Sequence, residues 1–340
     1  MSACPPLPGP SAPGIVTVGE TLACLALPAH GAVGRSGGLG LSTGGAESNA
    51  AVAASRLGVR TAWIGRVGDD DLGSLVVREL RGAGVDVVAR RDDRAPTGLM
   101  VKEHRGGRPV RVRYYRAGSA GSRLRPADVD ADLVGGAAAL HVTGVTAALG
   151  AGPRAAAMHA VAVARAAGTL VSVDVNFRAT LWSEREAVGP LRDLTALADV
   201  VFAGEEEASL VLDGRVGAPA EAGGPVWDRA ELLARRLLSL GPTTAVVKLG
   251  ALGALVLGPA GVHRQAAYPV AVVDPVGAGD AFAGGFLGET VLGRPAAHAA
   301  ETGARLGALA CAAPGDWEGV LDWRADRAGA EGVRVAEVAR

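Results

Sequence analysis

The sequence predicts an α/β protein built on a mostly parallel β-sheet. The first observation is that short apolar runs alternate with helical stretches from Ala138 onward, a rhythm typical of strand–helix–strand units. The second is size, because 340 residues with 49% hydrophobic side chains suffice for a large buried core. The third is composition, since 50 glycines and 4% aromatic residues favour close backbone packing.

The predicted strands of the second half are short and apolar. They are AALHVTG, TLVSVDV, ADVVFAG and TTAVVK, which end at Gly144, Val175, Gly204 and Lys248. Helical stretches are expected near 153–167, after Ser183, from Glu205 and near 228–240. The next runs, ALVLG and VHRQAA, flank Pro259-Ala260-Gly261 and predict an antiparallel hairpin at the sheet edge.

The first half has a different pattern. Residues 98–103 and 108–116 alternate apolar with polar side chains around a Gly-Gly turn, which predicts a half-exposed hairpin. Together with 22–41, this hairpin is expected to form a small separate sheet, a lid made by about 20–42 and 96–117.

The chain is predicted to be one domain over residues 14–320. The proline-rich residues 1–13 are expected to be a disordered tail, and 321–340 a C-terminal tail or helix. Residues 214–225 are rich in glycine and alanine and are interpreted as a surface loop rather than a domain linker.

Charge and cysteine content argue against several classes of partner. With 34 Lys plus Arg against 35 Asp plus Glu, the chain has no basic field for nucleic acid. Its three cysteines form no CxxC pair, which indicates a reducing, cytoplasmic setting. Residues 133–152 are uncharged over about 20 residues, enough for a membrane span. They include glycines, threonines and His141, so a buried strand plus loop is predicted, without membrane association.

The segment DPVGAGDAFAGGFL carries the most informative motif. A strand ending near Val273 is predicted to lead through a Gly-Ala-Gly turn into a helix that starts at about Asp280. The amides of Gly277, Ala278 and Gly279 can then point at one anion, as a phosphate cradle. Asp280 lies where a base can take the proton of an attacking hydroxyl, which predicts phosphoryl transfer to an alcohol. The alternative is that Asp280 only complements the helix N-terminus.

This segment resembles the second signature of the PfkB (ribokinase-like) carbohydrate kinases, and the likeness extends from Ile15 to Glu318. The family's first signature is similar to GGAESNAAVAASRLG, followed by IGRVGDDDLG. The resemblance implies a ribokinase-like α/β/α sandwich with a small β-sheet lid. It also implies that Gly44 and Gly45 let the backbone approach the sugar and that Asn49 contacts its hydroxyls. Taken alone, the two glycines could form an ordinary loop before a helix.

Four fragments are similar to the 2-keto-3-deoxygluconate kinases of this family: YYRAGSAGS, LHVTGVTAAL, SVDVNFRATLWS and GDWEG. The resemblance implies that Tyr114, Arg116 and Arg178 approach the substrate, with Arg178 as a carboxylate partner, and that Asp316 lies nearby. A guanidinium suits this task because it can make two charge-assisted hydrogen bonds to a carboxylate. Arg178 also follows a predicted strand, at the edge where α/β sheets bind ligands. The structural alternatives are that each arginine forms a surface salt bridge, that Tyr114 packs against a neighbour, and that Asp316 caps a loop.

The stretch VVKLGALG resembles the family's turn beside ATP, which implies that Lys248, Gly250 and Gly253 lie at the nucleotide. A lysine whose ammonium reaches solvent from a strand end is an equal alternative. Where the family commonly has Asn-x-x-Glu near the magnesium ion, this chain has Gly204 and Glu207. Glu207 is therefore expected to act on Mg²⁺ only indirectly.

Two further positions depart from the family pattern. Met100 stands where the keto-deoxy sugar kinases often have a tyrosine, and Ala304 where an asparagine beside the base is frequent. These changes leave the preferred sugar open.

The resemblance implies an ATP- and Mg²⁺-dependent kinase that phosphorylates the primary hydroxyl of 2-keto-3-deoxygluconate, a small sugar acid, with Asp280 as base. The alternatives are a ribokinase- or fructokinase-like enzyme for another sugar and a sugar-binding regulator without turnover. The intact Asp280 argues against the regulator. A second subunit could cover the edge of the lid sheet, which would make the protein a homo-oligomer.

Overall fold

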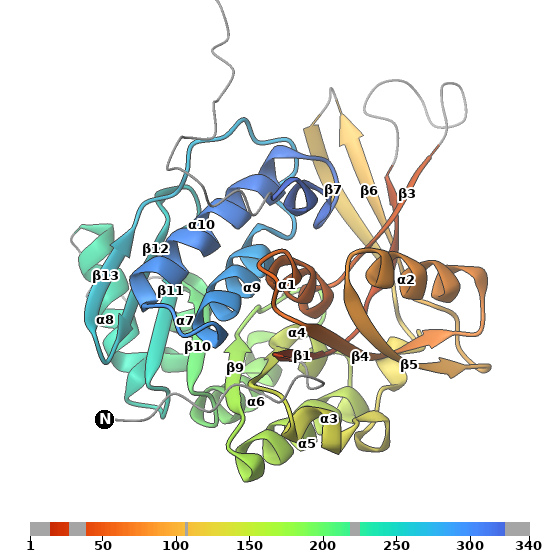
Figure 1. The fold of residues 1–340 in the computed structure, drawn as a ribbon, viewed down its shortest axis with the longest axis horizontal. Helices are drawn as coiled ribbons and strands as arrows, with labels where there is room; N and C mark the ends of the chain where they lie inside the picture. Colours follow the sequence, from red (N-terminus) through yellow and green to blue (C-terminus); the bar gives the residue numbers. More distant parts are fainter. Residues whose placement is uncertain (1–13, 27–38, 106–107, 218–224, 324–340) are drawn as a thin grey trace, which may run out of the picture.

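The computed structural model describes residues 14–26, 39–105, 108–217 and 225–323 (Figure 1). A nine-stranded sheet forms its centre, in the order β13-β12-β11-β10-β9-β8-β1-β4-β5. The strands are β1 (Ile15–Val18), β4 (Thr61–Gly68), β5 (Val85–Asp92), β8 (Ala139–Thr143), β9 (Leu170–Asp174), β10 (Val200–Gly204), β11 (Thr244–Lys248), β12 (Ala254–Gly258) and β13 (Gly261–Gln265). The predicted tails 1–13 and 324–340 lie outside the described residues.

Neighbouring strands of this sheet are parallel from β11 to β5. The pairs β11–β12 and β12–β13 are antiparallel, so the predicted edge hairpin is confirmed. In a parallel sheet the carboxyl ends of the strands meet at one edge. The segments that follow β1, β9, β10 and β11 are therefore brought together there.

Helices cover both faces of the sheet. One layer contains α3 (Ala131–Gly135), α5 (Ala151–Ala167), α6 (Glu184–Ala196), α7 (Glu205–Asp213) and α8 (Val226–Leu238). The other contains α1 (Ala46–Ser55), α9 (Ala278–Val291) and α10 (Ala296–Ala312), with α2 (Asp71–Gly82) beside β5. Along β1, Val16 points into the first core and Ile15 into the second, as the two-residue period of a strand requires. The predicted α/β/α sandwich is confirmed.

The small sheet is separate, with strand order β3-β2-β6-β7. Its strands are β2 (Leu22–Ala26), β3 (Gly40–Gly44), β6 (Leu99–Arg105) and β7 (Arg108–Tyr115). β3, β6 and β7 stand off from the main sheet at the upper right of Figure 1. The predicted hairpin is thus confirmed as β6–β7, while residues 27–38 of the predicted lid lie outside the described part of the chain.

Local sequence accounts for several helix ends. Ser183 is the N-cap of α6. Its backbone N–H donates to Glu186 Oε2 over 2.9 Å, and its hydroxyl accepts from the Glu186 amide. At the end of α5, Gly168 takes a φ of +77°, a left-handed conformation that glycine adopts without a Cβ penalty.

The segment before the Gly-Ala-Gly turn differs from the prediction. The strand predicted to end near Val273 is not formed, because the amides of Val273 and Asp274 donate to the carbonyl of Cys311 at the end of α10 instead of to a neighbouring strand. The following helix, α9, begins at Ala278 rather than at about Asp280. The glycine turn is therefore held against α10, and Gly279 lies inside the first helical turn.

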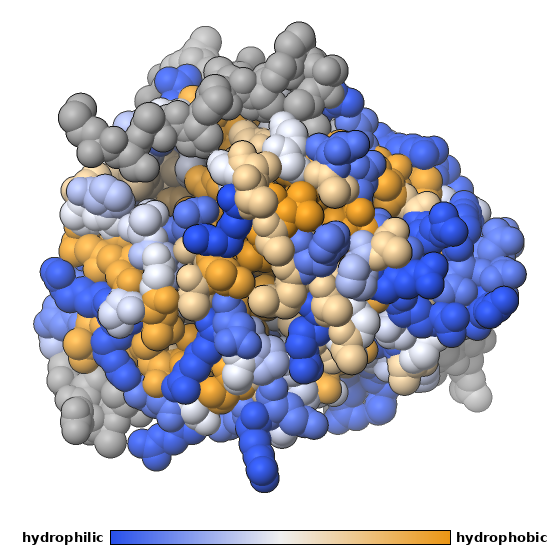
Figure 2. Space-filling model, turned by 90° about the horizontal axis from the view of Figure 1, so that it is seen from below, coloured by the Kyte–Doolittle hydropathy of each residue, from blue (hydrophilic) through white to orange (hydrophobic). Residues whose placement is uncertain are grey.

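The uncharged stretch 133–152 contains the buried strand β8, as predicted, but a short helix, α4 (Gly144–Ala148), follows in place of the predicted loop. Among the described residues, no helix has the length and apolar character needed to cross a membrane. Over the face shown in Figure 2, hydrophilic side chains lie between the hydrophobic ones.

Candidate active site

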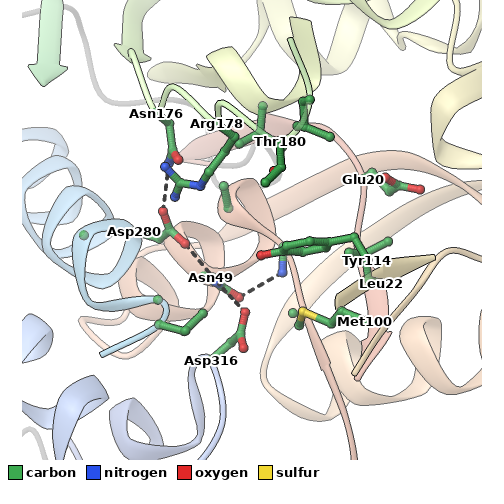
Figure 3. Close-up of a pocket in the computed structure, with 18 of the residues that line it drawn as sticks. Glu20, Leu22, Asn49, Met100, Tyr114, Asn176, Arg178, Thr180, Asp280 and Asp316 are labelled. Carbon is green, nitrogen blue, oxygen red and sulfur yellow. Dashed lines mark hydrogen bonds between the residues drawn. The ribbon is translucent and has the colours of Figure 1, made fainter. Parts of the chain in front are cut away.

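A pocket of about 250 Å³ lies between the carboxyl edge of the main sheet and the small sheet. Its walls come from both: Tyr114 and Met100 belong to the small sheet, whereas Asn176, Arg178 and Asp280 belong to the main domain (Figure 3). The pocket also contains Glu20, Gly44, Gly45, Asn49, Glu207, Lys248, Gly277, Gly279 and Asp316. Sequence-distant candidates are therefore brought to one place.

The glycine turn closes one end of the pocket. Gly277 has a φ of +83° and precedes the first residue of α9. A Cβ on it would lie 2.0 Å from the carbonyl oxygen of Asp316, so only glycine fits both the conformation and the space. The first amides of a helix have no partner within the helix, and those of α9 face this end. Gly277 and Gly279 line the pocket, whereas Ala278 is not among its lining residues.

Asp280 lies in the first turn of α9 and is held by two amides. Its Oδ2 accepts from Asn49 Nδ2 over 2.9 Å and its Oδ1 from Asn176 Nδ2 over 3.1 Å (Figure 3). Burial raises the pKa of Asp280 to about 7, against the hydrogen bond from Asn49 and the charges of Arg178 and Lys248, which lower it. A carboxylate with this pKa can accept a proton near neutral pH.

Asn176 was not predicted as a site residue. It has a φ of +40°, the one positive value at a non-glycine residue in the described chain. Its Oδ1 is buried without a hydrogen-bond partner, although its amide holds Asp280. The signal for it in the sequence is the asparagine of DVNFR just after a predicted strand, since asparagine tolerates left-handed backbone.

Arg116 reaches the pocket as predicted but is already paired. Its Nη2 lies 2.6 Å from Glu20 Oε2, and its side chain is only 10% exposed. Its guanidinium carbon lies 5.7 Å from the ring centroid of Tyr114, which lines the same wall. Glu20, which the sequence analysis missed, follows β1 and neutralises this arginine.

Arg178 differs from Arg116 in this respect. Its side chain is 47% exposed, and its Nη1 lies 3.8 Å from Glu207 Oε1, a loose contact at the edge of ion-pair range. The same nitrogen donates to the Phe177 carbonyl over 3.0 Å. The Arg178 guanidinium therefore remains available to an anion in the pocket.

The predicted Gly-Gly turn lies against Asp316 and Glu20. A Cβ on Gly44 would lie 2.2 Å from Asp316 Oδ2, and one on Gly45 would lie 2.3 Å from the Glu20 carbonyl oxygen. The Gly45 amide donates to Asn49 Oδ1 over 3.2 Å, which fixes the Asn49 side chain. Both glycines thus permit close approach of carboxylate and backbone.

Lys248 lines the pocket and is paired with Asp174, its Nζ lying 2.6 Å from Asp174 Oδ2. Gly250 and Gly253 are not among the lining residues of this pocket. A Cβ on Gly253, whose φ is +110°, would lie 1.9 Å from the Gln265 carbonyl oxygen, so this glycine is required where β13 ends. Ala304 is buried in the core beside α9.

Glu207 lines the pocket with both carboxylate oxygens engaged. Oε1 accepts from the Phe177 amide over 3.1 Å and Oε2 from the Gly204 amide over 2.7 Å. Gly204, which stands in place of the family's asparagine, thus contributes its backbone amide instead of a side chain. In the described part of the chain, no three His, Cys, Asp or Glu side chains gather as metal ligands.

A glycine turn at a helix N-terminus beside a buried carboxylate, on an α/β sandwich with a separate small sheet, is typical of enzymes that transfer phosphoryl groups to an alcohol. The chain belongs to the pfkB family of carbohydrate kinases, whose family model matches residues 12–323. It is therefore an ATP-dependent sugar kinase, and the family predicted from the sequence is confirmed.

Two curated relatives match most of the chain. A 2-dehydro-3-deoxygalactonokinase from Haloferax volcanii is 36% identical over 303 residues, covering 89% of this chain and 92% of the relative. A 2-dehydro-3-deoxygluconokinase from Bacillus subtilis is 35% identical over 309 residues, covering 90% of this chain and 91% of the relative. The prefix 2-dehydro is a synonym of 2-keto.

Solved structures agree with the fold. A 2-dehydro-3-deoxygluconokinase from Thermotoga maritima has a TM-score of 0.80 at 28% identity, covering 90% of this chain and 94% of its own. A ribokinase II from E. coli in complex with ATP and Mg²⁺ has a TM-score of 0.79 at 25% identity, covering 91% and 96%. The predicted use of ATP and Mg²⁺ agrees with this second structure.

Proposed function

We propose that this sugar kinase phosphorylates the primary hydroxyl of a 2-keto-3-deoxy sugar acid, with 2-keto-3-deoxygluconate as substrate. The supporting observation is the difference between the two pocket arginines. Arg116 is neutralised by Glu20 at 2.6 Å, whereas the nearest carboxylate to Arg178 among the described residues, that of Glu207, lies at 3.8 Å. The hydroxyls of a neutral sugar give Arg178 no charged partner, while a sugar carboxylate can accept two charge-assisted hydrogen bonds from it.

In this proposal the phosphate chain of ATP occupies the end of the pocket made by the glycine turn. This assignment rests on the backbone turn at Gly277, which lines the pocket, on the first amides of α9, and on the ammonium of Lys248, which lies 3.4 Å from the place of a Cβ at Gly279. Magnesium, when bound with the nucleotide, neutralises charge on the phosphates. Since both oxygens of Glu207 already accept backbone N–H groups, Glu207 would hold that ion through water.

Asp280 acts as the base. Asn49 and Asn176 each donate to one of its oxygens, so the carboxylate is oriented before the sugar arrives. The proton of the attacking hydroxyl passes to Asp280 as the oxygen attacks the terminal phosphorus, and the bond to the leaving diphosphate breaks. The amides of Gly277, Ala278 and Gly279 stabilise the charge on the transferring group.

The sugar end is assigned to the remaining lining residues. Arg178 binds the carboxylate, and Asn49 and Asp316 bind hydroxyls, with Tyr114 and Met100 on the lid side. Gly44 and Gly45 admit the sugar close to the backbone. Because the small sheet forms this wall, it would also exclude water, which otherwise would accept the phosphoryl group.

The galactonate epimer is a second candidate, because one relative bears that name. A coupled assay of ADP release with Mg-ATP decides among 2-keto-3-deoxygluconate, 2-keto-3-deoxygalactonate, gluconate, fructose and ribose. Turnover confined to the keto-deoxy acids is expected. Preference for fructose or ribose would refute the sugar-acid assignment and retain the kinase.

Self-association through the small sheet is part of the same proposal. Its outer face exposes Tyr115 and Leu41, at 61% and 51% exposure, next to partly buried Leu25, Leu99 and Val101. A second copy of this face would bury these apolar side chains. Light scattering after size exclusion is expected to give a dimer, and Tyr115→Glu with Leu41→Glu a monomer.

A further inference from the structure

Lys102 is a buried cation that none of the roles above uses. It belongs to β6 of the small sheet and is 1% exposed, although it is one of only two lysines in the chain. Met100, two residues earlier on the same face of β6, lines the pocket, whereas Lys102 lies behind the lining. A buried ammonium is costly unless it is paired, so its partners indicate its purpose.

The first partner is Asp274, at the start of the glycine turn. Lys102 Nζ donates to Asp274 Oδ2 over 2.5 Å. The other oxygen of Asp274 accepts from the amide of Val276 over 3.0 Å, and Val276 directly precedes Gly277. The lid sheet is thereby tied to the turn that forms the phosphate end.

The second partner is Asp316, whose carboxylate faces the pocket. Lys102 Nζ lies 2.7 Å from Asp316 Oδ1, and this ion pair leaves Oδ1 without a well-aligned hydrogen bond. Asp316 Oδ2 accepts from Asn49 Nδ2 over 3.4 Å, and the same nitrogen donates to Asp280 over 2.9 Å. A continuous chain of contacts therefore runs from Lys102 through Asp316 and Asn49 to the base (Figure 3 shows the last three).

The charge state of Asp316 depends on this lysine. Burial raises the pKa of Asp316, while the Lys102 charge and the Asn49 hydrogen bond lower it. The titratable groups around Asp316 include Cys24 of β2, Tyr114 of β7, Asp274, Glu318 and Asp280, which shares the Asn49 amide with it. Asp274, Glu318 and Asp280 are carboxylates that disfavour its ionised form, whereas the Lys102 ammonium, 2.7 Å from Asp316 Oδ1, favours it.

We propose that Lys102 is a positioning residue of the reaction, which acts from the lid sheet to keep Asp316 ionised toward the sugar and to fix the turn that begins at Asp274. This inference rests on the proposed function. By this inference the small sheet supplies the sugar site with a buried positive charge, in addition to one wall of the pocket.

The test compares Lys102→Met, Lys102→Arg and Arg113→Met by KM for the sugar acid, by kcat and by their pH dependence. Arg113 is the matched control, because it pairs with Glu103 at 2.6 Å on the outer face of the same hairpin. Since self-association is proposed for that face, light scattering checks that Arg113→Met keeps the wild-type oligomeric state. Lys102→Met is expected to raise the sugar KM by about 10-fold or more, since Asp316 loses its compensating charge. The sugar KM of this variant should fall again as pH rises from about 6 to 9 and Asp316 ionises. Lys102→Arg should stay within about 3-fold of wild type, and Arg113→Met should be unchanged.

An unchanged sugar KM with an unchanged pH dependence in folded Lys102→Met overturns the proposal and leaves a structural ion pair. If that variant does not fold, Lys102→Gln takes its place, because it keeps hydrogen-bond donors beside Asp274 and Asp316 but carries no charge, and a wild-type sugar KM there overturns the proposal equally. If the wild type turns over no sugar acid, the proposed function fails, and calorimetric binding of 2-keto-3-deoxygluconate to wild type and Lys102→Met decides for Lys102. Equal binding of this sugar acid to the two proteins, or no binding to wild type, rejects the proposed role of Lys102.

Discussion

The two ends of the pocket are built in different ways. The end that we propose for phosphate comes from one contiguous segment, the turn from Asp274 to Asp280, and offers mainly backbone groups and a helix terminus. The end that we propose for the sugar is assembled from side chains of β6, β7, the segment after β9 and the loop at Asp316. The groups offered by the first end come from one short segment, although α10 and Lys102 hold that segment in place, whereas the second end loses a group whenever any one of several elements is displaced.

The largest expected effect is at the junction of the two ends. Asp280→Asn removes the proton acceptor and is expected to lower kcat by about 10³-fold, because general-base catalysis contributes on this scale. The amides of Asn49 and Asn176 would then face an amide that can still accept at one oxygen, so the fold should persist. Steady-state kinetics measures the loss of kcat, and calorimetric sugar binding shows whether the folded site persists. Activity above a tenth of wild type would exclude Asp280 as the base.

The phosphate end is tested by Gly277→Ala, expected to lower kcat by about 10²-fold, the effect of losing one oxyanion donor. The new Cβ would lie 2.0 Å from the Asp316 carbonyl oxygen, so the turn must move. Gly261→Ala is the control, since Gly261 also has a positive φ, +96°, but nothing lies within 4 Å of its Cβ. Equal loss of activity in both variants would mean that general backbone strain, rather than the cradle, is responsible.

The sugar end is tested by Arg178→Met. The KM for the sugar acid is expected to rise about 10- to 100-fold, the equivalent of a lost charge-assisted hydrogen bond, with little change for any neutral sugar that reacts. Arg165→Met is a suitable control, because Arg165 Nη1 donates to the Leu197 carbonyl on the exposed surface between α5 and α6. A parallel rise for neutral and acidic sugars would contradict carboxylate recognition.

The smallest effect is expected from Asn176→Gly, which removes one donor to Asp280 while retaining freedom for a φ of +40°. The wild-type kcat/KM should fall as pH drops through about 7, the pKa of Asp280, because the base becomes protonated. Loss of the amide disfavours the charged carboxylate and raises that pKa, so the acid limb should move to higher pH. The pH profile of kcat/KM measures this shift. A profile identical to wild type would show that the hydrogen bond from Asn176 does not contribute to the pKa of Asp280.

The same contrast explains how much was predictable. The strand–helix rhythm, the edge hairpin, the separate small sheet and the glycine turn depend on local sequence, and all were predicted. Glu20, Lys102, Asp174 and Asn176 were missed because their partners lie far along the chain, as with Asp316, 214 residues beyond Lys102 by numbering. The strand expected before Asp274 was wrong because its backbone found a tertiary partner at Cys311 that no local pattern encodes.

The burial of Lys102 also has a practical consequence. The chain has only two lysines, one 1% exposed beneath the small sheet and the other, Lys248, in the pocket with 18% of its side chain exposed. Pairing with carboxylates raises the pKa of both amines, so neither is readily present as the neutral nucleophile. Amine-reactive reagents should therefore spare these lysines in the native protein, and acylation of Lys102 followed by peptide mass spectrometry would report how often the two sheets separate in solution.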